Sequence, residues 1–92
     1  MPEVLVEVEY CGKWGYEPKW RMLSQLIQDD VPSAQVPGAV GRIGSFDIKI
    51  NGVLVYSKMD KGVFPNFDDV VAAVKEVAEG KLSPEMCQID CC

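Results

Sequence analysis

Histidine is missing from this 92-residue chain, and so are long apolar runs. Without histidine the chain has no Cys-His or Ser-His nucleophile pair and no imidazole metal ligand, so its chemistry must use thiols, carboxylates or the backbone. No run approaches the roughly 20 apolar residues of a membrane-spanning helix. Because the sequence is 48% hydrophobic and 25% charged, these features together predict one small globular domain.

Basic residues are outnumbered by acidic ones. Nine Lys and Arg stand against fourteen Asp and Glu, which gives a net charge of −5. A protein that binds nucleic acid usually needs an excess of positive charge to neutralise phosphates. We therefore expect no nucleic-acid partner.

The four cysteines are unevenly placed, with Cys11 near the start and Cys87, Cys91 and Cys92 within the last six residues. This spacing does not resemble a disulfide framework, and three thiols near the end without histidine make a poor metal site. The first residues lack the basic and then apolar pattern of a signal peptide. We expect free thiols in a cytoplasmic protein that holds no metal.

The first half of the chain predicts a strand, a helix and a weaker strand. Apolar and acidic residues alternate from Val4 to Tyr10, which is typical of a strand. Residues 17–30 carry apolar side chains at helical spacing, and Pro18 suits a first helical turn, so a helix is expected there. Residues 34–40 favour a short or edge strand, because Pro37 and Gly38 interrupt them.

The second half predicts a hairpin and a helix. Asn51-Gly52 separates two β-rich runs, 45–50 and 53–57, and is the preferred type I′ turn because both turn residues need positive φ. A second helix is expected over about 67–78, before Gly80. The order β-α-β-β-β-α predicts an α+β, two-layer fold in which two main helices cover a four-stranded mixed sheet. We place the domain at residues 1–80 and a flexible, cysteine-bearing tail at 81–92.

Cys11 directly follows the first expected strand and stands on the loop into the first expected helix. Backbone N–H groups at a helix start carry partial positive charge that favours a thiolate, and Lys13 would add to it. Gly12 and Gly15 permit the tight backbone path of such a loop. From these features alone the thiol is either reactive or a buried core cysteine without a chemical role.

Several segments of the chain, taken together, resemble a known family. The first segment is residues 8–16, which contains Tyr10-Cys11-Gly12-Lys13-Trp14-Gly15-Tyr16, and the others are residues 43–48, 52–58 and 62–65. They resemble the selenoprotein W family, also called the Rdx family, over about residues 4–78. The resemblance implies a thioredoxin-like fold and a redox motif at the first strand-helix loop, Cys-x-x-Cys or Cys-x-x-selenocysteine. It thereby implies that Cys11 is the attacking thiolate.

Trp14 occupies the second redox position that the resemblance implies, and it has neither thiol nor selenol. The loop as written cannot form an intramolecular disulfide, whereas a lone thiolate can form mixed disulfides with glutathione or protein thiols. Glutathione is therefore the expected co-substrate, and no cofactor is expected. Three interpretations of Trp14 stay open: a natural replacement that packs over the loop or contacts a partner, a selenocysteine position changed to tryptophan by one base, and a core residue.

A second function class competes with thiol exchange. Trp14 and Tyr16, together with Phe64-Pro65, would make an exposed apolar patch around Cys11 if their loops meet in space. The chain would then be a non-catalytic adaptor that binds another protein through the Cys11–Tyr16 loop.

The cysteines near the end of the chain also admit more than one role. Cys87, Cys91 and Cys92 are candidates for a resolving thiol or for lipid attachment, or they are incidental thiols. A prenylation box would need cysteine fourth from the end, where this sequence has Ile89. We expect membrane association only if this tail is lipidated.

Overall fold

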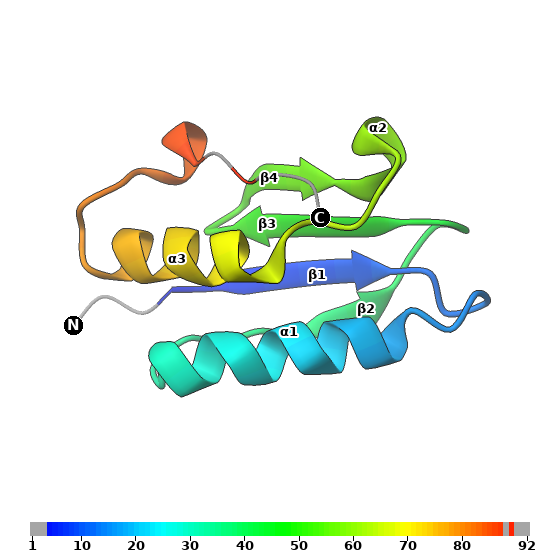
Figure 1. The fold of residues 1–92 in the computed structure, drawn as a ribbon, viewed down its shortest axis with the longest axis horizontal. Helices are drawn as coiled ribbons and strands as arrows, with labels where there is room; N and C mark the ends of the chain where they lie inside the picture. The colour runs from blue at the N-terminus through cyan, green and yellow to red at the C-terminus, as the bar shows by residue number, and fades with distance from the viewer. Residues whose placement is uncertain (1–3, 88, 90–92) are drawn as a thin grey trace.

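The computed structural model describes residues 4–87 and 89. Its elements in chain order are β1 (Val6–Tyr10), α1 (Glu17–Asp30), β2 (Gly38–Val40), β3 (Phe46–Ile50), β4 (Val53–Ser57), α2 (Lys58–Lys61), α3 (Phe67–Ala78) and the 3-10 turn η1 (Pro84–Met86). The strands form one sheet in the order β2-β1-β3-β4 (Figure 1). β1 and β2 are parallel and the other pairs are antiparallel, so the predicted four-stranded mixed sheet is confirmed.

The β3-β4 hairpin turns at Asn51 and Gly52, as predicted. Both residues have positive φ, 50° and 85°, which a type I′ turn requires. The Asn51 side chain also accepts a hydrogen bond from the Leu5 N–H at 3.0 Å. The turn therefore fixes the hairpin register and ties it to the start of β1.

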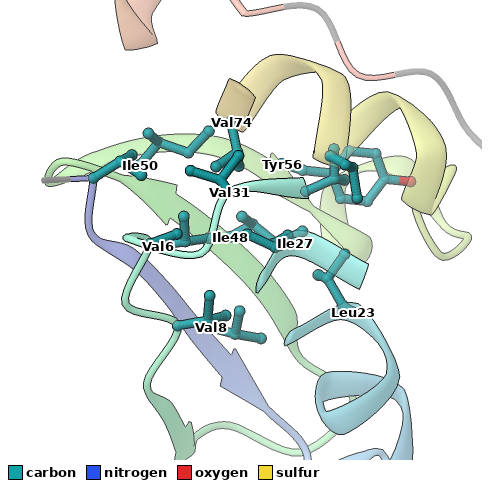
Figure 2. Close-up of a cluster of buried hydrophobic side chains, with 14 of the residues drawn as sticks. Val6, Val8, Leu23, Ile27, Val31, Ile48, Ile50, Tyr56 and Val74 are labelled. Carbon is teal, nitrogen blue, oxygen red and sulfur yellow. The ribbon is translucent and has the colours of Figure 1, made fainter. Parts of the chain in front are cut away.

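The core lies on one face of the sheet. Alternate residues of β1 and β3 point toward α1 and α3, which pack side by side on that face. Figure 2 shows part of this cluster, with side chains from both the sheet and the helices. Its labelled members are Val6, Val8, Leu23, Ile27, Val31, Ile48, Ile50, Tyr56 and Val74. Glu7 and Lys49 stand on the opposite face and are exposed, so the helices form one layer and the sheet forms the other.

Two short elements were not predicted. α2 is a single turn directly after β4, ended by Gly62 at a φ of 84°. η1 follows α3, and the described part of the segment after Gly80 packs Leu82, Cys87 and Ile89 against the core. These apolar side chains gain burial against the domain, and the flexible tail expected over residues 81–92 stays a prediction. The division of the chain at Gly80 stays a prediction.

Within residues 4–87 and 89, no helix is long and apolar enough to cross a bilayer.

Candidate functional site

Cys11 is held between the end of β1 and the starts of β3 and α1. Its N–H donates to the Ser45 carbonyl at 2.9 Å, and its own carbonyl accepts from the Tyr16 N–H at 3.1 Å. The residue is only 1% exposed. The backbone therefore fixes the thiol at one end of the sheet, just below the surface.

Backbone N–H groups surround the Cys11 sulfur. The Trp14 N–H donates to Sγ at 3.3 Å, and the backbone N–H groups of Gly44 and Lys13 also favour its thiolate form. Burial raises the pKa of the Cys11 thiol, but these N–H groups and the Lys13 charge together lower it by more. The pKa of Cys11 therefore lies below its ordinary value, and the site favours a thiolate.

The glycines of the site are placed where side chains fit poorly. Gly15 has a φ of 74°, and Gly44 has a φ of 81°. A Cβ on Gly12 would lie 3.1 Å from a methyl group of Val40. Gly44 was not among the predicted site residues, because its contact with Cys11 joins segments about thirty residues apart. The only sequence signal for it was its place in the second family-like segment.

Trp14 lies on the surface over this loop. It is 58% exposed, and its ring rests on Gly44, where a Cβ would come within 3.0 Å of the indole. The exposure rules out the interpretation of Trp14 as a core residue. The indole instead packs on Gly44, whose backbone N–H helps to lower the pKa of Cys11.

Aromatic side chains connect the loop to the core. The ring centroids of Trp14 and Tyr16 lie 6.1 Å apart, those of Tyr16 and Phe64 lie 4.8 Å apart, and those of Phe64 and Phe46 lie 5.2 Å apart. The two loops of the predicted apolar patch thus meet in space. Pro65 does not contribute to an exposed patch, because it is fully buried.

Comparison with known proteins identifies the family. The model of the Rdx family matches residues 5–76. This chain belongs to the Rdx family. Selenoprotein W from Ovis aries is 34% identical over 79 residues, which cover 78% of this chain and 91% of that protein. Migration and invasion enhancer 1 from Bos taurus is 33% identical over 78 residues, which cover 85% of this chain and 68% of that protein.

The fold of this Rdx protein also matches a solved structure. The selenoprotein W-related protein from Vibrio cholerae superimposes with a TM-score of 0.71 at 20% identity, over 83% of this chain and 98% of that one. This match supports the predicted thioredoxin-like fold. Membership of the Rdx family indicates a redox-related function, and Cys11 is the thiol that the fold places at the first strand-helix loop.

Cys87 lies away from Cys11. It directly follows η1, which Figure 1 shows at the opposite end of the sheet from the loop after β1. Burial raises the pKa of the Cys87 thiol, and the charges of Glu76 and Glu85 raise it further. The structure therefore does not bring Cys87 to Cys11 as a resolving thiol. Cys91 and Cys92 lie outside the described residues, and the described part of the chain contains no cluster of metal ligands.

The pKa values of the two described thiols should lie on opposite sides of the pKa of an ordinary cysteine, lower at Cys11 and higher at Cys87. We expect the alkylation of Cys11 by iodoacetamide to reach half its maximal rate at a lower pH than that of Cys87, since the pKa is lowered at Cys11 and raised at Cys87. Steric cover scales the rate equally at every pH, so the midpoint reports the pKa. Peptide mapping across a pH series measures both thiols in one sample. In the urea-unfolded chain both midpoints should lie at about pH 8.5. A Cys11 midpoint at or above that of Cys87 in the folded protein contradicts the lowered pKa of Cys11.

Proposed function

We propose that this Rdx protein is a monothiol exchange protein of a reducing, cytoplasmic compartment. The Cys11 thiolate attacks one sulfur of a disulfide and forms a mixed disulfide with glutathione or a protein thiol, while the other sulfur leaves as a thiolate. A second external thiol then releases Cys11 by the same exchange. The observation that carries this proposal is the set of N–H groups from Lys13, Trp14 and Gly44 around Sγ, which lowers the pKa of Cys11.

Among residues 4–87 and 89 no second thiol lies beside Cys11, so the proposed exchange uses an external thiol. Trp14 stands where a second redox residue would close an intramolecular bond, and Cys87 lies toward the other end of the sheet. The remaining interpretations of Trp14, a natural replacement and a converted selenocysteine position, are separated by the native gene. An ordinary tryptophan codon at position 14 ends the second interpretation.

Reaction at Cys11 requires the loop to open, because the residue is only 1% exposed. The loop is suited to opening on its outer side. Trp14 is largely exposed, and nothing lies within 4 Å of where a Cβ on Gly15 would stand. A small displacement of the indole and its turn would therefore expose the sulfur without disturbing the core.

Oxidised glutathione tests the proposal directly. We expect the protein to gain one glutathionyl group on Cys11, released by dithiothreitol and absent in Cys11→Ser, whereas Cys87→Ser keeps it. Intact mass with peptide mapping measures both. Thiol exchange is contradicted if Cys11 gains no glutathionyl group. It is also contradicted if the same peptide of Cys11→Ser gains the group to an equal extent.

A second function, that of a protein-binding adaptor, is favoured by one observation. Three exposed apolar side chains lie at the end of the sheet where the Cys11 loop begins: Trp14 at 58%, Val40 at 68% and Ile43 at 56% exposure. Such a patch is typical of a protein-docking surface. The two functions separate at Cys11→Ser, which an adaptor tolerates and an exchange protein does not.

A further inference from the structure

Two lysines from different helices converge on one aromatic ring beside the Cys11 loop. Lys19 of α1 and Lys58 of α2 each place their Nζ 5.2 Å from the centroid of Phe64. Lys58 also lies 5.4 Å from the ring centroid of Tyr16. The two ammonium groups therefore contact the same aromatic ring. Their separation is at most about twice the distance of each from the ring centroid.

Neither ammonium group has a carboxylate partner within residues 4–87 and 89. The ion pairs of that part of the chain are Arg21 with Glu17, Arg42 with Asp47, and Lys81 with Glu79. Contact with an aromatic face favours each lysine's position, but an ammonium group has three N–H donors and the ring does not neutralise its charge. Two like charges held together in this way attract an anion.

The surroundings strengthen this local excess of positive charge. Lys13 lies on the adjoining loop and acts on Cys11. Of the carboxylates at this end of the sheet, Glu17 is held by Arg21 at 2.8 Å and Asp47 by Arg42 at 3.2 Å. Glu9 precedes Cys11 by two residues, and Asp60 follows Lys58 by two residues in α2. In a chain whose net charge is −5, Lys13, Lys19 and Lys58 thus lie around the Cys11 loop without an ion pair to any described residue.

The Phe64 ring is also connected to the Cys11 loop through Tyr16. Phe64 contacts Tyr16 at 4.8 Å between centroids, and the Tyr16 N–H donates to the Cys11 carbonyl at 3.1 Å. An anion bound by these lysines would therefore lie on the side of the molecule where Tyr16 joins the Cys11 loop to Phe64. The Phe64 ring would give the aliphatic part of the same molecule an apolar contact.

We propose that Lys19 and Lys58 form a carboxylate-binding site that selects anionic disulfides for exchange at Cys11. This inference rests on the proposed function. The reaction is a balanced exchange, in which the Cys11 sulfur joins one half of the bound disulfide and the other half leaves as a reduced thiolate. The carboxylate belongs either to a glutathione-type peptide or to an acidic side chain of a partner protein, and both present the same chemistry to the two lysines.

Disulfides of different charge test the site. The rate constant for mixed-disulfide formation at Cys11 is measured by mass spectrometry with anionic oxidised glutathione, neutral bis(2-hydroxyethyl) disulfide and cationic cystamine. The proteins are the unchanged chain, the double variant Lys19→Gln/Lys58→Gln, and a matched control, Lys49→Gln/Lys75→Gln, which removes the same charge from exposed positions on β3 and α3. Because a change in the Cys11 pKa would alter all three rates, only a change in their ratio reports the site.

We expect the Lys19→Gln/Lys58→Gln variant to react about tenfold more slowly with oxidised glutathione and no more slowly with cystamine, as two exposed ion pairs would give. The control should stay within about twofold, and about 1 M salt should abolish the difference. An equal rate ratio in the variant and the unchanged chain overturns the carboxylate site and leaves thiol exchange standing. No reaction of Cys11 with any disulfide overturns the proposed function itself.

A further experiment tests whether the carboxylate comes from a partner protein or from a glutathione-type peptide. The mixed disulfide is formed from an acidic peptide disulfide and from the same peptide with glutamine in place of glutamate. A lysine-dependent preference for the acidic peptide greater than that for oxidised glutathione supports a protein partner. A greater lysine-dependent preference for oxidised glutathione supports a glutathione-type substrate. The carboxylate site is overturned if the lysines create no preference for either the acidic peptide or oxidised glutathione.

Discussion

Trp14→Cys is expected to give this protein an intramolecular disulfide between Cys11 and the new thiol at position 14. The Trp14 N–H already lies 3.3 Å from the Cys11 sulfur, and the bonds Gly15 N–H to Gly12 carbonyl and Tyr16 N–H to Cys11 carbonyl fold residues 11–16 into tight turns. We expect this tight turn to allow the Cα separation of about 4.4–6.8 Å that a disulfide needs. Equilibration with glutathione buffers should give a reduction potential between about −270 and −120 mV, the range of thioredoxin-like dithiols.

Trp14→Ser is the matched control for this prediction, because it removes the same indole and adds no thiol. It should show no intramolecular disulfide, and it should form the mixed disulfide with glutathione faster than the unchanged chain, since the ring that rests on Gly44 is lost. The prediction is wrong if peptide maps of oxidised Trp14→Cys show both thiols still reduced, or show Cys11 paired only with another cysteine of the chain.

The elements of this fold could be read from the sequence where a local pattern is enough to specify them. Asn51-Gly52 demands positive φ at both residues, and the structure has it. The alternation in β1 reappears as the buried face of the sheet. α2 was not foreseen, because a four-residue helix carries too few residues for a periodic pattern.

Trp20 shows that helical spacing alone does not predict how deeply a side chain is buried. Trp20 is one of the apolar residues at helical spacing in the expected helix over residues 17–30, and the structure leaves it half-buried at the edge of the sheet. Its ring stacks on Tyr10 at 5.6 Å and lies on Gly38, while its N–H donates to the Val36 carbonyl at 3.1 Å. An amphipathic side chain takes this place because its polar edge needs a partner.

The candidate site was predictable in position but not in its electrostatics. The sequence and the family resemblance locate Cys11 at a strand-helix loop, and they suggest that helix N–H groups favour its thiolate. The donors in the structure instead include Gly44, which comes from the loop before β3. The meeting of Lys19 and Lys58 over Phe64 likewise depends on how α1, α2 and the loop before α3 pack together. Tertiary contacts of this kind leave no local signature.

Phe46→Ala is expected to lower the free energy of unfolding by about 3–5 kcal/mol, because it leaves a cavity in the centre of the core. Phe46 is fully buried, and its ring packs against Phe64 at 5.2 Å and Phe67 at 6.2 Å between centroids. A small domain has only about 5–15 kcal/mol in total, so the loss is a large part of its stability. Urea denaturation followed by circular dichroism measures the change.

Ile43→Ala is the control for that experiment, because Ile43 is 56% exposed and its truncation should cost no more than about 0.5 kcal/mol. Phe46→Leu should fall between the two variants, since it keeps an apolar side chain while losing part of the ring's volume. The loss at Phe46 should also reach the site, because the Phe46 ring supports Phe64, on which Lys19 and Lys58 converge. Phe46→Leu should therefore weaken the preference for anionic disulfides even under conditions where it is fully folded. If Phe46→Ala unfolds at the same urea concentration as Ile43→Ala, the aromatic side chains do not form the continuous support that joins the core to the Cys11 loop.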